Sequence, residues 1–225
     1  MSKTEAENST LVRLEQKWNY IKQNRPRKAR PDGSSALLLH RFDMTQRTLP
    51  DFLAPGLDIV SIGINPSLYS VERGFYFARP GNRFWPALNA SGLVVPPLAP
   101  SREAVESLFH THRIGFTDLV KRATARAAEL ADADYRQGTR VLQKKLARYA
   151  PAIAWFHGVS AYRLFLAHGG TPRAKVAIGL QPERVGLTRI FVTPNPSGAN
   201  PSANPKQLVP LYRELAALRD RLNSN

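Results

Sequence analysis

Short apolar segments alternate with longer amphipathic segments over most of the chain. Residues 57–64 form an apolar, β-branched segment that ends at Asn65-Pro66, as a buried parallel strand would. The same kind of segment predicts two further firm strands and one weaker strand, over residues 152–157, 189–193 and 175–179. Amphipathic spacing predicts helices over residues 82–91, 101–112, 136–149 and 158–167. A last helix begins between Asn204 and Pro210, because proline fits only the first turn of a helix.

Strands that alternate with helices predict an α/β protein with a parallel sheet covered on both faces. In such folds, sites lie beyond the carboxyl ends of the strands, where the loops converge. Two of the three firm strands end in Asn-Pro loops, at residues 65–66 and 195–196. We therefore expect the functional site to lie at these two loops.

The first 50 residues differ in character from the rest. Residues 8–23 carry apolar side chains near a helical period, whereas residues 25–31 hold four basic side chains and two prolines, which favour an extended chain. We expect a basic N-terminal extension, partly helical or flexible, over residues 1–50, followed by a folded domain over residues 51–225.

The charge balance narrows the class of partner. The 225 residues carry 32 Lys and Arg against 17 Asp and Glu, a net charge of +15, and the pI is near 10.6. Such an excess predicts a polyanionic partner. Residues 1–55 hold 10 basic and 6 acidic side chains, so +4 lies there and +11 on the remainder. The folded domain is therefore itself basic.

Composition also excludes several kinds of site. Without cysteine the chain forms no disulfide, thiolate zinc site or iron–sulfur cluster and has no cysteine nucleophile. The histidines show no metal-ligand spacing, and we expect no metal. No apolar run approaches about 18 residues and the N-terminus is polar, so we expect a cytoplasmic protein without a membrane segment.

Residues 74–85 place five aromatic side chains among glycine and proline. We expect Phe84 and Trp85 to belong to the core. Phe77 lies in the loop after the expected site, where its face could stack on a planar base. The preceding segment, residues 63–68, is by itself an ordinary exit from a strand, and it has neither a Walker pattern nor a G-x-G-x-x-G pattern.

Four segments, taken together in this order, resemble the mismatch-specific uracil/thymine-DNA glycosylase family of the uracil-DNA glycosylase superfamily. They are residues 63–68, 74–85, 114–119 and 195–198. The resemblance implies a three-layer α/β/α sandwich with a short central parallel sheet, and it makes residues 51–225 the catalytic domain. The implied function is that of a monofunctional DNA glycosylase of base-excision repair, which flips out uracil and removes it by hydrolysis without a cofactor, leaving an abasic site.

The resemblance also implies roles for residues of this chain. Asn65 matches the asparagine that positions the attacking water, and Phe77 matches the ring that covers the flipped base. The base-binding pocket would consist of Gly63, Ile64, Ser67, Phe77 and Asn82. The insertion loop, which enters the duplex, would consist of Asn195, Pro196, Ser197, Gly198 and Ala199. The DNA backbone would be contacted by Arg79, Arg83 and Lys206.

Asp118 departs from the family pattern, which has Asn or Lys at this position. One interpretation is a helix N-cap or a solvated carboxylate. The other is a second catalytic residue, which acts as a general base or stabilises positive charge on the sugar, raises activity and broadens the substrate range. Asn65 can orient a water but cannot take its proton, so Asn65 alone would make a slow catalyst.

Two further departures concern the substrate. The insertion loop has Ala199 and Pro201 where relatives place a bulky wedge or an arginine. We therefore expect weak mismatch discrimination, with double-stranded DNA carrying uracil or a mismatched base as the main partner and single-stranded DNA as a second substrate. Ser67 replaces a glycine common in the family, so its side chain would narrow the pocket or bond to a base edge, which argues against thymine excision.

Other functions stay open from sequence alone. One is a non-catalytic DNA-binding module on the same fold; another is a nucleotide or nucleoside hydrolase, which the net charge of +15 disfavours. If the chain binds DNA, we expect a nucleoid-associated monomer. Asp58 lies at the far end of its strand from Asn65, and we expect no catalytic role for it. Four residues of one helix form either a solvated face or further phosphate contacts: Arg140, Lys144, Lys145 and Arg148.

Overall fold

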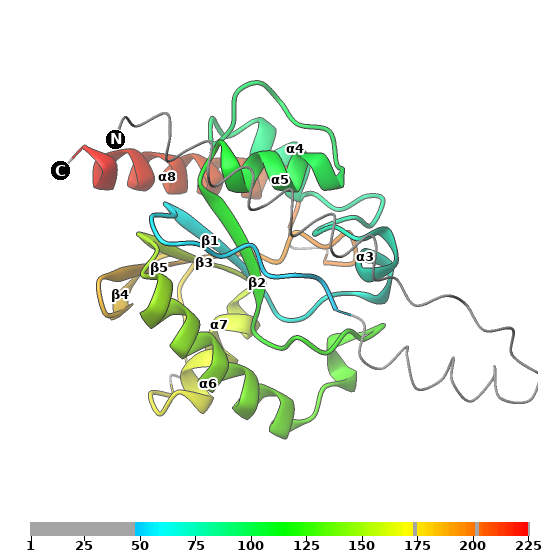
Figure 1. The fold of residues 1–225 in the computed structure, drawn as a ribbon, viewed down its shortest axis with the longest axis vertical. Helices are drawn as coiled ribbons and strands as arrows, with labels where there is room; N and C mark the ends of the chain where they lie inside the picture. The colour runs from blue at the N-terminus through cyan, green and yellow to red at the C-terminus, as the bar shows by residue number, and fades with distance from the viewer. Residues whose placement is uncertain (1–47, 173–174, 201–202, 225) are drawn as a thin grey trace, which may run out of the picture. The chain divides into compact units, whose positions relative to one another are not determined.

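The computed structural model describes residues 48–172, 175–200 and 203–224, and its centre is a five-stranded sheet. In their order across the sheet, the strands are β2 (Ile114–Asp118), β1 (Ile59–Gly63), β3 (Ile153–His157), β5 (Thr188–Thr193) and β4 (Gly179–Val185) (Figure 1). The first four strands are parallel, and β4 is antiparallel to β5. The predicted parallel sheet is present, with one antiparallel strand at its edge.

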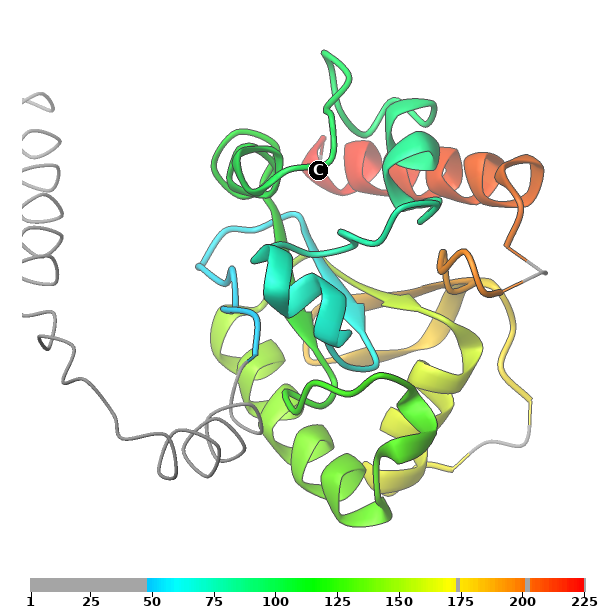
Figure 2. The same cartoon turned by 90° about the vertical axis from the view of Figure 1, so that its right-hand side faces the viewer.

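Helices cover both faces of this sheet and complete three layers. One face carries α4 (Phe84–Asn89), α5 (Arg102–His110) and α8 (Pro205–Asn223) (Figure 1). The other face carries α6 (Asp132–Tyr149) and α7 (Val159–His168), and Figure 2 shows both layers from the side of the short α3 (Leu68–Arg73). A 3-10 turn, Ala127–Glu129, precedes α6. The predicted three-layer α/β/α architecture is therefore confirmed.

A hydrophobic core lies on each face of the sheet, because successive side chains of a strand point to opposite faces. Ile59, Phe116 and Trp155 pack in the core beneath α4, α5 and α8, together with Phe84 and Trp85 as predicted. Val60, Ile62 and Phe156 point to the opposite face and pack with residues of α6 and α7. Because both faces of β1 and β3 are buried, their sequences are nearly continuous apolar segments.

Two strands differ from the expectations. The apolar pattern predicts no strand over residues 114–118, because a glycine and two polar residues interrupt it, yet all five residues are buried in β2. The strand expected over residues 175–179 is wrong in position, since β4 begins at Gly179. Buried and exposed residues alternate at the start of β4, as is common in an antiparallel edge strand, so no apolar segment marks it.

The predicted helices are present with shifted ends. α8 begins at Pro205, and Asn204 caps it by accepting a hydrogen bond from the Gln207 amide. α4 is shorter than predicted because the side chain of Asn82 accepts from the Phe84 amide, just before the first turn. α6 begins at Asp132, four residues earlier than predicted.

The helix predicted over residues 8–23 and the basic segment over residues 25–31 lie outside the described residues. The division into an extension and a catalytic domain therefore stays a prediction. Among the residues that the structure describes, no helix is long and apolar enough to cross a membrane.

Candidate active site

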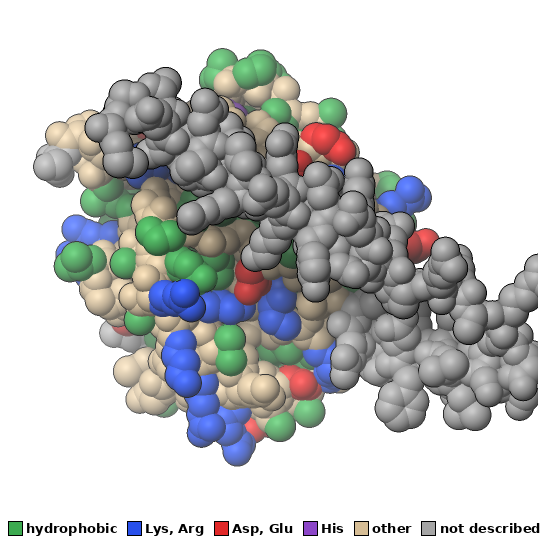
Figure 3. All heavy atoms as spheres, in the orientation of Figure 1, with side chains coloured by type: hydrophobic (Ala, Val, Ile, Leu, Met, Phe, Trp, Pro, Cys, Tyr) green, Lys and Arg blue, Asp and Glu red, His purple; other side chains and the backbone are tan. Residues whose placement is uncertain are grey.

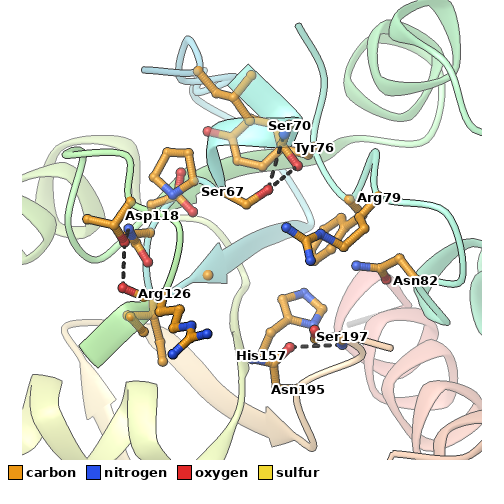
Figure 4. A pocket seen from close by; sticks show the side chains of 18 of the residues that line it. Ser67, Ser70, Tyr76, Arg79, Asn82, Asp118, Arg126, His157, Asn195 and Ser197 are labelled. Carbon is orange, nitrogen blue, oxygen red and sulfur yellow. Dashed lines mark hydrogen bonds between the residues drawn. The ribbon is translucent and has the colours of Figure 1, made fainter. Parts of the chain in front are cut away.

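A cavity of about 450 Å³ opens at the carboxyl ends of the parallel strands, a volume suited to a small organic molecule (Figure 4). It brings together eleven residues predicted for the site: Gly63, Ile64, Asn65, Ser67, Phe77, Arg79, Asn82, Asp118, Asn195, Ser197 and Ala199. It also includes residues that the sequence analysis did not single out, among them Tyr76, Thr124 and His157. The two Asn-Pro loops thus meet at one cavity, as their positions predict.

The floor of the cavity follows from the register of the sheet. Gly63 of β1 pairs with Asp118 of β2, and His157 of β3 pairs with Thr193 of β5. Since Ile62 pairs with Phe156, Gly63 and His157 also lie side by side. A Cβ atom on Gly63 would lie 2.7 Å from Oδ1 of Asp118. Only glycine at this position leaves space between the side chains of Asp118 and His157.

The amide of Asn65 has a fixed orientation. Its Nδ2 donates hydrogen bonds to the carbonyl oxygen of Arg122 (2.9 Å) and to Oγ1 of Thr124 (2.8 Å). Thr124 is buried, and its own hydroxyl donates to the carbonyl oxygen of Arg126 (2.8 Å). Both N–H groups of the amide are therefore used, and Oδ1 has no hydrogen-bond partner in the described part of the chain. This oxygen is an acceptor for a water molecule in the cavity.

Asp118 is the last residue of β2 and is only 4% exposed. It is therefore neither a helix N-cap nor a solvated carboxylate, and the first interpretation of this residue is wrong. Burial raises its pKa to about 6, because water no longer solvates the charge, while Lys121 opposes this effect. Nζ of Lys121 lies 3.6 Å from Oδ2 of Asp118. A carboxylate with this pKa can exchange a proton near neutral pH.

Lys121 is shared between two acids. Its Nζ lies 2.9 Å from Oδ1 of Asp51, which also accepts a hydrogen bond from the hydroxyl of Thr117 (2.8 Å). Lys145 of α6 pairs with the other oxygen of Asp51 at 2.6 Å. Because Lys121 also pairs with Asp51, it stabilises the charge of Asp118 less than it would alone. Lys145 is likewise paired with Asp51 instead of being free at the surface.

Phe77 lies on a rigid support. Its ring stacks on that of Phe84, with centroids 4.0 Å apart and planes 12° apart, and Phe84 is fully buried. The backbone of Phe77 has φ +56°, a strained conformation for a residue with a large side chain. The ring lines the cavity and is held there by the core, as a stacking platform requires.

Arg83, for which we predict a contact with the DNA backbone, is hydrogen-bonded to the insertion loop. Its guanidinium donates to the carbonyl oxygens of Ser197 (3.2 Å) and Asn200 (2.7 Å). Its backbone amide donates to the carbonyl oxygen of Pro196 (2.9 Å). The Ser197 amide in turn donates a hydrogen bond to the side-chain oxygen of Asn195 (3.0 Å). Arg83 thus braces the insertion loop through one of its guanidinium nitrogens, and its contact with the DNA backbone stays a prediction.

Two predicted pocket residues have hydrogen bonds that the sequence did not indicate. The hydroxyl of Ser67 accepts from the Ser70 amide, where it caps α3, and donates to the Ser70 hydroxyl. Its proton is therefore not directed at a base edge. The side-chain oxygen of Asn82 accepts from the Phe84 amide, so only its Nδ2 is free for a ligand.

The remaining predicted residues lie at or away from the rim. Arg79 is exposed and lines the cavity (Figure 4). Lys206 is exposed in the first turn of α8 and is not part of the cavity lining, and neither are Pro196 and Gly198. Asp58 pairs with Arg113 at 2.9 Å at the start of β1, far from the cavity, which agrees with a structural role. Over the described residues, no group of His, Asp and Glu is arranged to hold a metal ion.

Lys and Arg side chains gather along α6 (Figure 3). Four of them are exposed and recur every fourth residue, which places them on one face of the helix: Arg136, Arg140, Lys144 and Arg148. Arg136 pairs with Asp132, whereas the other three have no acidic partner in the described ranges. This basic face is open to solvent.

The cavity thus combines a side-chain amide of fixed orientation, a buried carboxylate and an aromatic ring supported by the core. A family model described as the Uracil DNA glycosylase superfamily matches residues 50–216, and the chain belongs to this superfamily. Membership supports a uracil DNA glycosylase role, with DNA as the partner.

Among solved structures, the chain is similar to a Methanosarcina acetivorans protein described as a "putative Uracil DNA glycosylase", determined by solution NMR. The two share 22% sequence identity with a TM-score of 0.46, over 76% of this chain and 98% of that one.

Proposed function

We propose that the chain is a monofunctional uracil-DNA glycosylase of the mismatch-specific type, with Asn65 and Asp118 as catalytic residues. The fixed amide of Asn65 carries the proposal, because it leaves Oδ1 as the one group of that side chain able to hold the attacking water. Asp118 lines the same cavity and, with a pKa of about 6, is mostly ionised at neutral pH. The pair supplies what Asn65 alone lacks, a group that accepts the proton of the water.

The proposed reaction exchanges one bond at C1′ of the sugar for another. The oxygen of the water bonds to C1′ as the bond between C1′ and the base nitrogen breaks, and the electron pair of that bond leaves with the base. The proton of the water passes to the carboxylate of Asp118. Before that transfer, the negative charge of Asp118 stabilises the positive charge that develops on the sugar. No metal or cofactor takes part in this scheme.

Base flipping precedes the chemistry, because a stacked base cannot reach the cavity. Phe77, supported by Phe84, would stack on the flipped base. The insertion loop presents small side chains, Ser197 to Ala199, to the space that the base leaves. Small side chains fill this space poorly, so we expect weak discrimination of the opposite base and excision from single-stranded DNA as well.

The proposed DNA contacts are electrostatic. Arg79 at the rim and Lys206 on α8 are exposed cations that would bind backbone phosphates. We further propose that residues 1–50 form an extension that adds sequence-independent affinity to a catalytic domain over residues 51–225, because the extension carries a net positive charge of its own.

Single-turnover excision tests the proposal, on duplexes with a U:G or U:A pair and on single-stranded DNA with uracil, with alkaline cleavage reporting abasic sites. We expect Asn65→Ala to lower the rate at least about 100-fold and to leave DNA affinity unchanged. Asn223→Ala, at the exposed end of α8, is the matched control and keeps the wild-type rate.

Other outcomes would identify the alternatives. Salt-dependent DNA binding by a wild-type protein that excises nothing would indicate a non-catalytic binding module. A failure to bind DNA at all, with hydrolysis of free nucleosides, would indicate a small-molecule hydrolase.

A further inference from the structure

His157 is a buried polar residue of the cavity to which the proposed reaction gives no task. It ends β3 and is only 2% exposed, yet it belongs to the cavity lining. Nε2 lies 2.8 Å from the hydroxyl oxygen of Ser61, and Nδ1 has no hydrogen-bond partner among the residues that the structure describes. Figure 4 shows the ring beside Asn195 and Ser197, across the cavity from Asp118. Nδ1 is itself screened from solvent, so an acceptor reaches it only after a small turn of the ring. Because a buried nitrogen without a partner is destabilising, a ligand that supplies one would offset the cost of that turn.

The hydrogen bond between Ser61 and His157 indicates which nitrogen of the imidazole ring carries the proton. The buried hydroxyl of Ser61 has only Nε2 of His157 as a partner in the described part of the chain. If Ser61 donates to Nε2, its proton is satisfied and Nδ1 carries the ring hydrogen. The reverse arrangement would leave both the Ser61 proton and a bare Nδ1 unsatisfied. The first arrangement therefore leaves fewer groups unpaired and makes Nδ1–H a donor.

The ring stays neutral in this environment. Burial lowers the pKa of His157 to about 3, and aromatic rings surround it, with the centroid of Trp155 at 4.2 Å and that of Phe77 at 4.9 Å. A neutral donor binds a carbonyl oxygen without bringing a charge into the cavity.

The register sets the distance across the cavity. Asp118 and His157 lie on the two strands that flank β1, with Gly63 between them. Two strand spacings separate their backbones by about 10 Å, and a glycine leaves the middle free. A single planar ring fits into this space with a side chain at each of its two edges.

We propose that His157 is a specificity-determining residue that reads the edge of the flipped base opposite to Asp118, by donating from Nδ1 to a carbonyl oxygen. This inference rests on the proposed function and deepens it. Uracil has a carbonyl oxygen where cytosine has an amino group, and deaminated purines likewise carry a carbonyl oxygen in place of an amino group. A fixed donor therefore selects deaminated bases as a class, since an amino group would meet the Nδ1 hydrogen with one of its own.

The test measures base binding separately from excision. Binding of free uracil and free cytosine is followed by ligand-detected NMR, and excision of uracil by single-turnover kinetics. We expect His157→Leu to reduce uracil affinity and excision about 10- to 100-fold. His157→Asn, which retains a donor, should restore most of both. Thr139→Val should change neither. It too removes a buried polar group that has no partner in the described part of the chain, but Thr139 lies on α6, outside the cavity.

Each outcome decides the point. Wild-type affinity for uracil in a folded His157→Leu variant overturns the inference and leaves the proposed function standing. Uracil binding that depends on His157 in a protein without excision activity supports the inference and refutes the proposed function. Should the leucine variant not fold, the ¹⁵N shifts of the His157 ring in the wild-type protein take its place. A proton on Nδ1 that shifts on addition of uracil supports the inference, and a proton on Nε2 overturns it.

Discussion

Asp118 and His157 are both buried at the carboxyl end of the sheet, on either side of Gly63, but their surroundings differ. Asp118 belongs to a series of charges, with Lys121 at 3.6 Å and Asp51 beyond it. Within the described ranges, His157 has one hydrogen-bond partner, Ser61, and its ring packs against aromatic rings. Burial raises the pKa of Asp118 to about 6 and lowers that of His157 to about 3. Burial thus favours the neutral form of both residues, but it brings only the pKa of Asp118 closer to neutral pH.

This difference separates two tasks within one cavity. A group that accepts a proton must titrate near the working pH, and nearby charges tune it. A group that reads a base must keep one protonation state, which aromatic surroundings ensure for His157. The residue that titrates near neutral pH lies on β2, and the residue that keeps one protonation state lies on β3.

Replacing Asp118 by Asn should have the largest effect. We expect uracil excision to fall about 100- to 10,000-fold, because the amide cannot take the proton of the water. The wild-type rate should rise with pH through about 6 and level off above it, since only the ionised form of Asp118 is active. The residual rate of the variant should not vary over this range. Single-turnover rates between about pH 5 and pH 8 measure both effects, and a variant as fast as the wild type would remove Asp118 from the mechanism.

The two residues should also affect stability with opposite dependence on pH. The folded-state pKa of Asp118 is raised above the 3.8 of an unfolded aspartate, so its stabilising contribution is lost as pH rises from about 4 to 6. The folded-state pKa of His157 is depressed from 6.5 to about 3, so its contribution is lost as pH falls below about 6.5. Relative to wild type, Asp118→Asn should gain about 3 kcal/mol in free energy of unfolding between pH 4 and pH 7.

His157→Asn is the comparison for that measurement. Relative to wild type, the free energy of unfolding of His157→Asn should fall by a similar amount between pH 4 and pH 7, about 3 kcal/mol. Urea unfolding at the two pH values measures both variants. Equal changes in the same direction for the two variants would contradict the assigned protonation states.

Thr124→Val should reduce excision about 5-fold. The variant removes one of the two acceptors that fix the amide of Asn65, and one hydrogen bond contributes about 1 kcal/mol. DNA affinity should not change, because Thr124 is buried beneath the amide. Thr139→Val serves again as the control. An unchanged excision rate in Thr124→Val would show that the Arg122 carbonyl alone suffices to hold Asn65.

Lys121→Met should have the smallest effect on the rate. Removing the cation beside Asp118 raises the pKa of that carboxyl, so the rising part of the pH–rate profile should move to higher pH while the plateau is kept. Lys144→Met should leave the profile in place. It removes an exposed cation of α6 that has no acidic partner among the described residues. A shift to lower pH would mean that Lys121 acts mainly on Asp51.

The strands show what an apolar pattern can and cannot reveal. β1, β3 and β5 are buried on both faces and carry continuous apolar segments, so the sequence predicts them. β2 is equally buried, but Thr117 and Asp118 interrupt its pattern for reasons that lie elsewhere in the molecule. Thr117 donates to Asp51, and Asp118 faces the cavity. Functional and bridging residues therefore hide a central strand from the pattern.

The site shows a similar division. Asn65, Phe77 and Asp118 belong to local motifs and could be placed at the cavity from the sequence. Thr124 and His157 could not, because their partners Asn65 and Ser61 lie 59 and 96 positions away. Arg83 was the opposite case: its charge suggests a DNA contact, but its acceptors are carbonyl oxygens 114 and 117 positions further along the chain. Whether a charged side chain is available to bind a ligand therefore depends on contacts between distant segments, which the sequence alone does not show.

The bonds of Arg83 bear on the entropy of DNA binding. A loop that becomes ordered only on binding loses conformational freedom at that moment, and its affinity falls accordingly. Here the protein itself supplies bonds that order the loop, from Arg83 to the carbonyl oxygens of Pro196, Ser197 and Asn200. Most of the unfavourable ordering on encounter therefore falls on the nucleic acid, which must unstack and turn out a base. A weakly paired base makes that step easier, so a preordered loop lets the condition of the DNA govern the outcome.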